Sequence, residues 1–565
     1  MSDLSRFTTA SLPVGLLAAL LCSAPSLAQD PASRQQPYQQ PLPAPQFEGG
    51  EKPGDFVLPP LPEPSATDPL SAQARIFVKT IRVLGNTVFP PERIAEVAAP
   101  FVGRVISSGE LQELRYRLTK LYVDAGYITS GVILPDQTVK DGLVTFQVIE
   151  GRLAKIQVSI DGRLDPDYVR ERARLGAAAP LNVENLRNEL QRLHLDPLIR
   201  RIDSRLEPSP VLGESILSIE VEEDRPYQVV VGVDNYRSPS IGSIQPRIEA
   251  WHGNITGAGD RLDARFRTTS GLEDYFFAYQ YPVGPRGAAV GLELRKTHSL
   301  VVERPFDELD IVSDTQDAAL FYRRPLLREL DRNLDLRLSL EKRRSTTYLL
   351  GERFSFSPGV INGQSAVSVL RVVTDYLDRE PDRVIALRGT FSVGFDAFGA
   401  TTEAGEPDGR FFTWLVQGQY ARRFPATGAQ IIARADWQQA FEPLLPLEQF
   451  GVGGRYSVRG YRENQLVRDS GISASVEYRH PVFADEFGAS QTQLALFADW
   501  GSAWNREADT PTPKTLASVG IGLRWEPNDR LKTELYAAYS LRHIDNNGHD
   551  PQDSGLHFSL SYALF

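Results

Sequence analysis

The chain has 565 residues, a formal net charge of −11 at pH 7 with 24% charged residues, and a sequence pI near 5.4. This acidic balance argues against nucleic acid as the main partner, because nucleic-acid-binding domains are usually basic. The length predicts several domains. Beyond the N-terminus no run approaches the roughly 20 apolar residues of a membrane helix, so a spanning segment is expected only as a β-barrel.

The N-terminus has the features of a secretory signal peptide over residues 1–28. Arg6 supplies a weak positive start, LPVGLLAALLC is an apolar run, and Ser26-Leu27-Ala28 provides a small-residue cleavage site. The apolar run is too short to cross a bilayer as a helix. Cys22 is the only cysteine, so we expect no disulfide in the mature chain.

Three further segments follow the signal peptide. Residues 29–74 form a linker with eleven prolines between Pro31 and Pro69, which we expect to be extended or disordered and not to form a packed core. Residues 75–151 show the order strand, helix, helix, strand, strand, and residues 152–223 repeat that order. Two consecutive copies of one pattern predict two small α+β domains.

From about residue 224 to the end, helical periodicity gives way to short alternating runs. In 334–341 leucine alternates with Asp, Arg, Ser and Glu, and 555–564 alternates in a similar way. A soluble β-sandwich also alternates, but in a membrane barrel the apolar face meets lipid and the charged face lines an aqueous lumen. Residues 224–565 are therefore predicted to form a transmembrane antiparallel β-barrel.

Counting strands backward from the C-terminus locates the segment GVGGRYSVRGY. Runs that end near residues 565, 541, 525, 501 and 482 predict five strands. An even-stranded barrel entered from the N-terminal domains also ends on their side, which puts the connections 502–514 and 542–554 outside. The segment before the fifth strand from the end is then an external-side loop, in agreement with its lack of alternation.

Four stretches carry a family resemblance: AGYITSGVILPDQ, VDNYRSPSIG with GNITGAGDRL, GGRYSVRGY, and FADWG. They resemble the outer-membrane transporters of two-partner secretion systems (TpsB, the haemolysin-activator type), in the superfamily that includes BamA. The resemblance implies POTRA domains at 75–151 and 152–223, in the periplasm, and a sixteen-stranded outer-membrane barrel at 224–565. It also implies export of an unfolded secreted partner of the adhesin, cytolysin or contact-dependent toxin type, captured by the POTRA domains.

The resemblance implies site residues as well. The loop that carries the first motif is expected to fold back into the barrel, where its arginine meets an acidic residue of the inner wall. Alternation over 494–500 separately directs Asp499 into the lumen. A plain, solvated lumen carboxylate is the alternative interpretation. The expected site residues are a loop motif (Val458, Arg459, Gly460, Tyr461), a barrel-wall partner motif (Phe497, Asp499, Gly501), a POTRA signature (Gly126, Tyr127, Ile128, Pro135) and the barrel-assembly terminus Phe565.

Two features depart from the family. Many members carry a pore-plugging helix where this chain has QDPASRQQPYQQPLPAP, and interior prolines disfavour a helix. Phe565 falls on the opposite parity to the outward set of the last strand, which a bulge or a frayed last residue would reconcile.

No motif for catalysis or cofactor binding is present. We find no GxxxxGKS/T, HExxH or GxSxG pattern, and the seven histidines lack metal-ligand spacing. We therefore expect no enzyme activity, no metal and no cofactor. The expected partners are the secreted exoprotein, outer-membrane lipid and the barrel assembly machinery, and not nucleic acid. A BamA-like assembly factor is the alternative function, disfavoured because this chain has two repeats rather than five; a passive pore, an adhesin and a barrel enzyme are further rivals.

Overall fold

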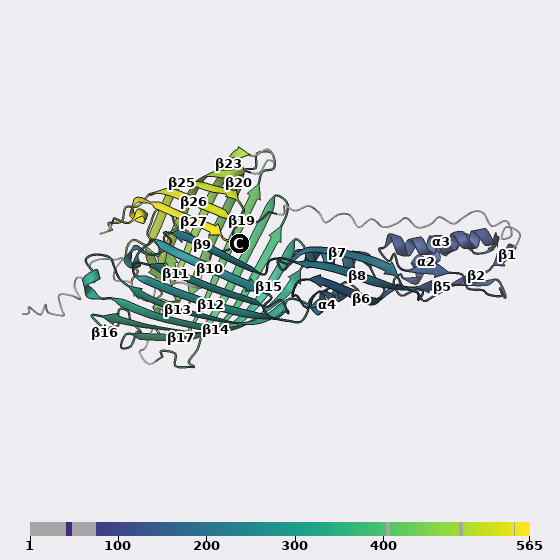
Figure 1. Ribbon diagram of the computed structural model, residues 1–565, viewed down its shortest axis with the longest axis horizontal. Helices are drawn as coiled ribbons and strands as arrows, with labels where there is room; N and C mark the ends of the chain where they lie inside the picture. Colours follow the sequence, from purple (N-terminus) through teal and green to yellow (C-terminus); the bar gives the residue numbers. More distant parts are fainter. Residues whose placement is uncertain (1–40, 48–74, 403–406, 485–489, 547–548) are drawn as a thin grey trace, which may run out of the picture.

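The computed structural model describes residues 41–47, 75–402, 407–484, 490–546 and 549–565. The expected signal peptide at 1–28, most of the linker and most of the segment that replaces the plug helix lie outside these residues. Figure 1 shows an elongated molecule in which two small α+β units follow one another outward from one end of a barrel.

The first unit is built around a three-stranded sheet. Its elements are β1 (Arg75–Val78), β2 (Thr80–Leu84), α2 (Pro91–Ala98), β3 (Arg104–Ser107), α3 (Ser108–Asp124), β4 (Gly131–Ile133) and β5 (Leu143–Ile149). β2 pairs in parallel with β5, which pairs antiparallel with β4. The first strand in the order expected for residues 75–151 is two strands, because the chain breaks at Lys79, whose N–H donates to the Gly142 carbonyl at 2.8 Å. β1 pairs instead with β3, a strand that the sequence pattern did not predict.

The second unit repeats this arrangement. Its elements are β6 (Arg152–Asp161), α4 (Pro166–Leu175), α5 (Val183–His194), β7 (Ile199–Pro208) and β8 (Glu214–Glu223). β6 pairs in parallel with β8, which pairs antiparallel with β7, so the last strand is central in both units. Asn182 caps α5 by accepting from the N–H groups of Glu184 and Asn185. Within the described residues, no helix has the length and apolar character needed to cross a membrane.

Sixteen antiparallel strands close into a barrel, as the resemblance implied. They are β9 (Tyr227–Asp234), β10 (Gln245–Gly253), β11 (Arg261–Thr269), β12 (Leu272–Val283), β13 (Ala288–Leu300), β14 (Val312–Arg328), β15 (Arg332–Leu349) with its short extension β16 (Glu352–Arg353), β17 (Gln364–Arg379), β18 (Arg383–Gly394), β19 (Phe411–Arg423), β20 (Gln430–Ala440), β23 (Ser470–Ala484), β24 (Ser490–Trp504), β25 (Thr515–Asn528), β26 (Leu531–Ser540) and β27 (Leu556–Ala563). We call the end that carries the second unit the proximal end and the other the distal end. The five strands counted from the C-terminus are all present.

Alternation along the strands separates two faces. On β15, Leu338 and Leu340 point outward and are 39% and 40% exposed, whereas Ser339 and Arg343 point inward and are 2% and 3% exposed. The strands are longest on one part of the wall, where β14, β15 and β17 have 17, 18 and 16 residues, whereas about 9–11 residues suffice to cross a bilayer. These three strands are longer than a bilayer needs and so extend beyond it.

The proximal turn 254–260, which contains most of the motif GNITGAGDRL, joins the barrel to the second unit. The Gly257 carbonyl accepts from the Asp165 N–H at 2.8 Å, at the start of α4. The Glu223 carboxylate accepts from the Leu164 N–H at 3.0 Å and from the Asn254 side chain at 2.6 Å. One carboxylate thus bonds to both the second unit and the barrel.

Candidate functional site

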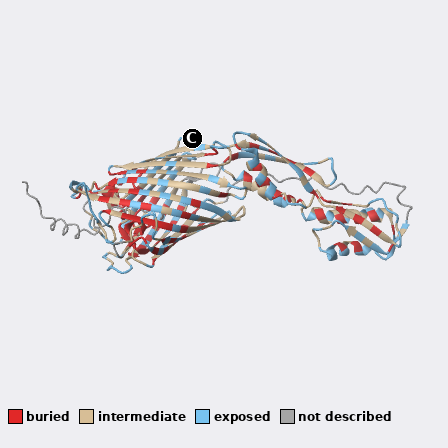
Figure 2. Ribbon diagram, turned by 90° about the horizontal axis from the view of Figure 1, so that it is seen from below, coloured by how far each residue is buried: buried red, intermediate tan, exposed pale blue. Residues whose placement is uncertain are grey.

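The connection between β20 and β23, residues 441–469, folds into the barrel; we call it the inward loop. It contains η5 (Pro446–Glu448) and a hairpin of β21 (Phe450–Val452) with β22 (Leu466–Arg468). Phe450, Val452 and Val458 are fully buried and pack with Leu415 and Leu516 of the wall. Figure 2 shows buried positions gathered in the distal half of the barrel, the half that the inward loop fills.

Arg459 is the best anchored residue of this loop. It is 2% exposed, and its Nε and Nη2 each donate to the Asp499 carboxylate at 2.8 Å. Its backbone N–H donates to the same carboxylate at 3.0 Å, and its guanidinium lies 3.5 Å from the centre of the Phe497 ring. Such a two-pronged pair fixes the orientation of the loop as well as its position. Asp499 is only 4% exposed, so the solvated-carboxylate alternative is wrong.

Glu477 of β23 is a second acceptor that sequence reasoning missed. One of its oxygens accepts from Arg459. The other accepts from Arg479 at 2.6 Å and from the Tyr536 hydroxyl at 3.2 Å. Its inward parity on β23 was the available signal, but parity alone does not say which charge it meets.

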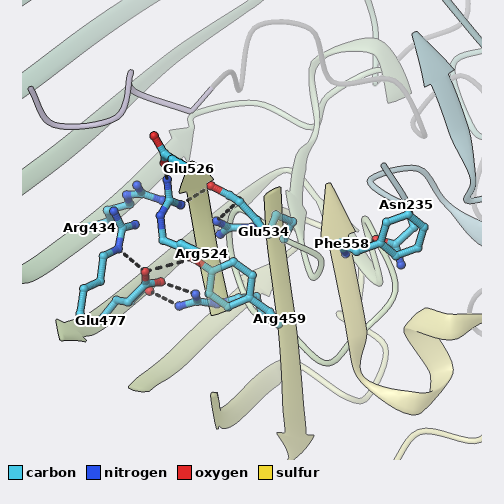
Figure 3. A network of polar contacts seen from close by, with 12 residues as sticks. Asn235, Arg434, Arg459, Glu477, Arg524, Glu526, Glu534 and Phe558 are labelled. Carbon is cyan, nitrogen blue, oxygen red and sulfur yellow. Dashed lines mark hydrogen bonds and ion pairs between the residues drawn. The ribbon is translucent and has the colours of Figure 1, made fainter. Parts of the chain in front are cut away.

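A neighbouring set of charges joins the same network. Arg455 of the inward loop donates to Glu534 at 2.7 Å and lies 4.2 Å over the Tyr536 ring. Arg524 donates to the other oxygen of Glu534. Figure 3 shows Arg459 and Glu477 turned toward one another beside Arg524 and Glu534. Because each buried charge has an opposite partner, the cost of removing it from water is offset.

Two glycines of the expected motifs are required by close approach. A Cβ at Gly501 would lie 2.5 Å from Val452 of the inward loop, and a Cβ at Gly460 would lie 2.8 Å from Ala538. Gly460 also has φ +89°, a conformation that glycine adopts without strain. Its N–H donates to His557 Nε2 at 3.0 Å. At both positions the lack of a side chain therefore lets the inward loop and the barrel wall come into contact.

The residues after Gly460 tie the inward loop to other distal loops. The Tyr461 hydroxyl accepts from the Arg542 N–H at 3.1 Å. Arg462 donates to Asp553 at 2.5 and 2.8 Å and to Glu303 at 2.7 Å. The motif VRGY thus contacts both the wall and the loops around the distal opening.

Glu448 gives the inward loop a second anchor on a different part of the wall. Arg371 of β17 donates to both of its oxygens at 2.8 Å, and Arg343 of β15 donates to one at 3.0 Å. Glu448 is 1% exposed and the two arginines 3%. Sequence reasoning missed this cluster; its only signal is one carboxylate within the apolar stretch PLLPLEQF.

The described part of the linker, residues 41–47, lies inside the barrel. The Pro43 carbonyl accepts from Gln419 Nε2 at 3.0 Å. Phe47 packs on the inward side chains of Val384, Ala421 and Ile432. The lumen therefore contains both this segment and the inward loop.

The glycine of the POTRA signature lies where the two units meet. Gly126 has φ +89°, and its carbonyl accepts from the Val183 N–H at 2.9 Å. Asn182 reaches back to the Ala125 carbonyl at 3.1 Å. The glycine therefore links the C-terminal end of α3 to the start of α5.

The other three signature residues lie apart from this junction. Tyr127 packs edge-on against Tyr122, with ring centres 6.2 Å apart. Burial and a hydrogen bond to Glu150 raise the pKa of the Tyr122 hydroxyl well above its usual value, so it keeps its proton. Ile128 lies in a turn that precedes β4, which starts at residue 131, and Pro135 is exposed beyond β4.

The position of the C-terminus explains why Phe565 does not follow the alternation of the last strand. β27 ends at Ala563, so Phe565 lies past the strand, in line with a frayed last residue. Its ring packs against the ring of Tyr227 on the first barrel strand, with centres 5.9 Å apart. The last residue thus contacts the start of the barrel.

Comparison with known proteins identifies the family. A family model described as haemolysin secretion/activation protein ShlB/FhaC/HecB matches residues 213–525, more than half of the chain. The chain belongs to this family. A second model, the ShlB-type POTRA domain, matches residues 76–151.

Individual relatives agree with this assignment. The outer membrane transporter CdiB of Dickeya dadantii is 22% identical over 79% of this chain and 80% of its own length. The solved structure of CdiB from Escherichia coli has a TM-score of 0.64 at 20% identity and covers 90% of this chain and 93% of its own. A BamA from Haemophilus ducreyi that lacks POTRA domains 1–3 gives 0.54 at 14% identity, with 87% and 100% coverage, a likeness of fold alone.

Membership of the ShlB/FhaC/HecB family orients the molecule. The protein is an outer-membrane transporter of two-partner secretion, with its POTRA region in the periplasm. The proximal end of the barrel therefore faces the periplasm and the distal end faces the cell exterior. The inward loop is a connection that starts and ends on the exterior side.

Proposed function

We propose that the protein exports one dedicated, unfolded secreted partner through its barrel, and that the inward loop controls the pore. The observation that carries this proposal is the burial of Arg459 against Asp499 and Glu477 in the lumen. A loop held by a desolvated charge pair has a defined docked position, and its release costs free energy that an arriving client must supply.

We assign the second unit, residues 152–223, as a further POTRA domain that captures the client. β7 pairs only with β8 within the described residues, which leaves its other edge for an extended segment. Backbone hydrogen bonds at a strand edge demand little of side chains, which suits a partner that must stay unfolded. The partner is of the adhesin, cytolysin or contact-dependent toxin type.

Site-specific crosslinking tests this edge. The only cysteine of the chain is Cys22, within the expected signal peptide, so one introduced cysteine is unique in the mature protein. Arg205→Cys on β7 is expected to crosslink to a cysteine-bearing client during export, and Lys155→Cys on β6 is the control at the opposite edge. Crosslinking through β6 alone would place capture elsewhere.

Transport requires the lumen contents to move. The inward loop and residues 41–47 occupy the path between the proximal and distal ends. The client would then move along a lumen lined by Arg, Glu and Asp side chains, which present no large apolar surface to which it could bind. Folding of the client outside gives the movement its direction.

The loop role is tested with Arg459→Ala, which removes the cation that pairs with the buried Asp499 carboxylate, at a cost of about 3–5 kcal/mol. Glu477 keeps Arg479 as a partner. Secretion is expected to be lost while the barrel stays inserted, because sixteen paired strands do not depend on this residue. Arg468→Ala is the control from the same loop, since its guanidinium donates to the adjacent Val467 carbonyl. Normal secretion by the Arg459→Ala protein would contradict the role proposed for the inward loop.

The choice between exporter and assembly factor needs a separate measurement. Mass spectrometry of culture supernatant and outer membrane, with and without the protein, is expected to show loss of one or two large exoproteins. Broad depletion of outer-membrane barrels would instead favour the assembly factor.

A further inference from the structure

Three cations lie on the outer, lipid-facing surface of the barrel. Lys296 on β13, and Lys342 and Arg344 on β15, are exposed and share strand parity with outward leucines such as Leu294 and Leu340. All three lie in the distal half of their strands, on the cell-exterior side. At the same height, the outward positions of the other described barrel strands hold no Lys or Arg.

Strand register places these cations together. Lys296 pairs directly with Gln316, and Gln316 pairs directly with Arg344, so the three form one outward row across β13, β14 and β15. Lys342 is in the neighbouring row, where it pairs with Ala318. Adjacent strands lie about 4.8 Å apart and rows of one face about 7 Å apart, so one ligand of moderate size can reach all three.

The wall becomes apolar on the proximal side of the cations. The row of Lys342 also contains Phe277 and Leu294, 40% and 43% exposed. The next contains Leu320, Leu340 and Leu370 in direct register. The cations therefore lie at the outer edge of the hydrocarbon band, where charges on a barrel wall cost least and meet lipid headgroups.

A hollow on the wall adjoins the cations. It has a volume of about 890 Å³ and is lined by Phe266, Tyr275 and Phe277 as well as by the three cations. The small residues Ala264 and Ala318 lie between larger side chains and make room for it. Its lining joins aromatic surface to positive charge, the combination that an acylated, phosphorylated lipid would match.

We propose that this surface binds lipid A, the phosphorylated glycolipid anchor of lipopolysaccharide in the outer leaflet. Its phosphates face Lys296, Lys342 and Arg344, and an acyl chain lies in the hollow beside Phe277. Arginine and lysine both bind phosphate strongly, and clusters of basic residues at a membrane surface recognise anionic headgroups.

Acidic residues near the patch do not neutralise it. Glu273 and Asp314 lie one row farther from the apolar band, and Asp314 pairs with His298 at 2.8 Å. Lys342 donates one hydrogen bond to the Phe398 carbonyl, which leaves further N–H groups of its ammonium for a ligand. Asp317 also lines the hollow, but it has inward parity and accepts from Arg343 in the lumen at 3.2 Å. Among the outward side chains of this part of the wall, the cations are therefore the charges nearest the acyl chains.

Binding to the purified full-length protein in detergent tests the proposal. The probe is bis-phosphorylated lipid A, with dephosphorylated lipid A, phosphatidylglycerol and inorganic pyrophosphate as comparisons, and the readout is the Kd from microscale thermophoresis. Each lost cation is expected to weaken binding about five-fold, so Lys296→Gln, Lys342→Gln and Arg344→Gln combined should weaken it on the order of a hundred-fold. Heat-modifiable electrophoretic migration confirms that each variant is a folded barrel.

The control carries the same charge loss at the periplasmic ends of other strands: Arg324→Gln, Arg422→Gln and Lys532→Gln, all exposed. It should bind lipid A normally, as should Lys296→Arg with Lys342→Arg and Arg344→Lys. Unchanged affinity in the neutralised variant would overturn the proposal. So would equal binding of dephosphorylated lipid A, of phosphatidylglycerol or of pyrophosphate alone.

Discussion

Arg459 and Glu448 attach the inward loop to two different parts of the barrel wall. Each does so through a buried charge. Arg459 meets β23 and β24, whereas Glu448 meets β15 and β17. A buried ion pair adds little net stability, but removal of one partner is expensive because the other charge stays buried. Both residues therefore act mainly by fixing a position.

Glu448→Gln tests the second anchor. The change keeps the size of the side chain and removes the charge that two arginines share, so the inward loop should dock less firmly and secretion should fall. Protease sensitivity of the loop on intact cells should rise several-fold. Glu352→Gln, an exposed residue at the same end of the barrel, is the control; equal effects of the two would show that Glu448 has no anchoring role.

Gly501→Ala tests the close approach of loop and wall. The new Cβ would lie 2.5 Å from Val452, and overpacking of this kind costs about 1–3 kcal/mol. Loss of secretion with normal barrel insertion is expected, together with partial rescue by Val452→Ala. Gly418→Ala is the control because its Cβ would meet nothing nearer than 3.4 Å. A Gly501→Ala protein that secretes normally would refute the steric argument.

At the scale of elements, sequence periodicity predicted the helices and strands, which are determined by local interactions. Alternation predicted the barrel and its last five strands, and repeated helix spacing predicted both α+β units. The resemblance implied that the loop folds into the barrel. Its second anchor was not predictable, because Arg371 and Glu448 are 77 residues apart in sequence and parity says only that each charge faces inward. The pairing of Arg459 with Asp499 was expected from the family motif, not from spacing.

The joint between the second unit and the barrel is an element whose rigidity can be measured. Glu223→Ala removes the acceptor shared by Leu164 and Asn254, so the unit should move more freely relative to the barrel. Electron–electron distance measurements between spin labels on α4 and β11 should show a broader distribution. Glu220→Ala, exposed on the same strand, should leave the distribution unchanged, and a narrow distribution in Glu223→Ala would contradict the prediction.

At the scale of the whole molecule, the pore is occupied by two segments that come from far apart in the chain. Residues 41–47 and the inward loop, residues 441–469, both lie in the lumen. The described contacts of the first segment include one hydrogen bond from Gln419, the Phe47 ring on apolar wall residues, and the Arg423 guanidinium 5.1 Å from the centre of that ring, but no ion pair like those of the inward loop. It should therefore leave more easily than the loop.

Conductance in planar bilayers tests whether residues 41–47 obstruct the pore. Replacement of residues 41–47 by Gly and Ser should raise single-channel conductance, because less of the lumen is filled, and Phe47→Ala should have a smaller effect in the same direction. Phe424→Ala, an exposed phenylalanine in a proximal turn, is the control. Unchanged conductance in the replacement would mean that the segment does not obstruct ions.

The junction between the first and last barrel strands also has a consequence for folding. β9 and β27 share only five residue pairs, against sixteen between β14 and β15. The Asn235 side chain adds a hydrogen bond to the Leu556 carbonyl and accepts one from the Phe558 N–H. These two partners are 321 and 323 positions away in the sequence, and Figure 3 shows Asn235 beside Phe558. Contacts of such sequence separation form late, since the closure entropy of the whole intervening chain opposes them. Ring closure is then the final event of folding, and until the C-terminal strand arrives, the nascent sheet carries two open edges that would pair with any other strand nearby.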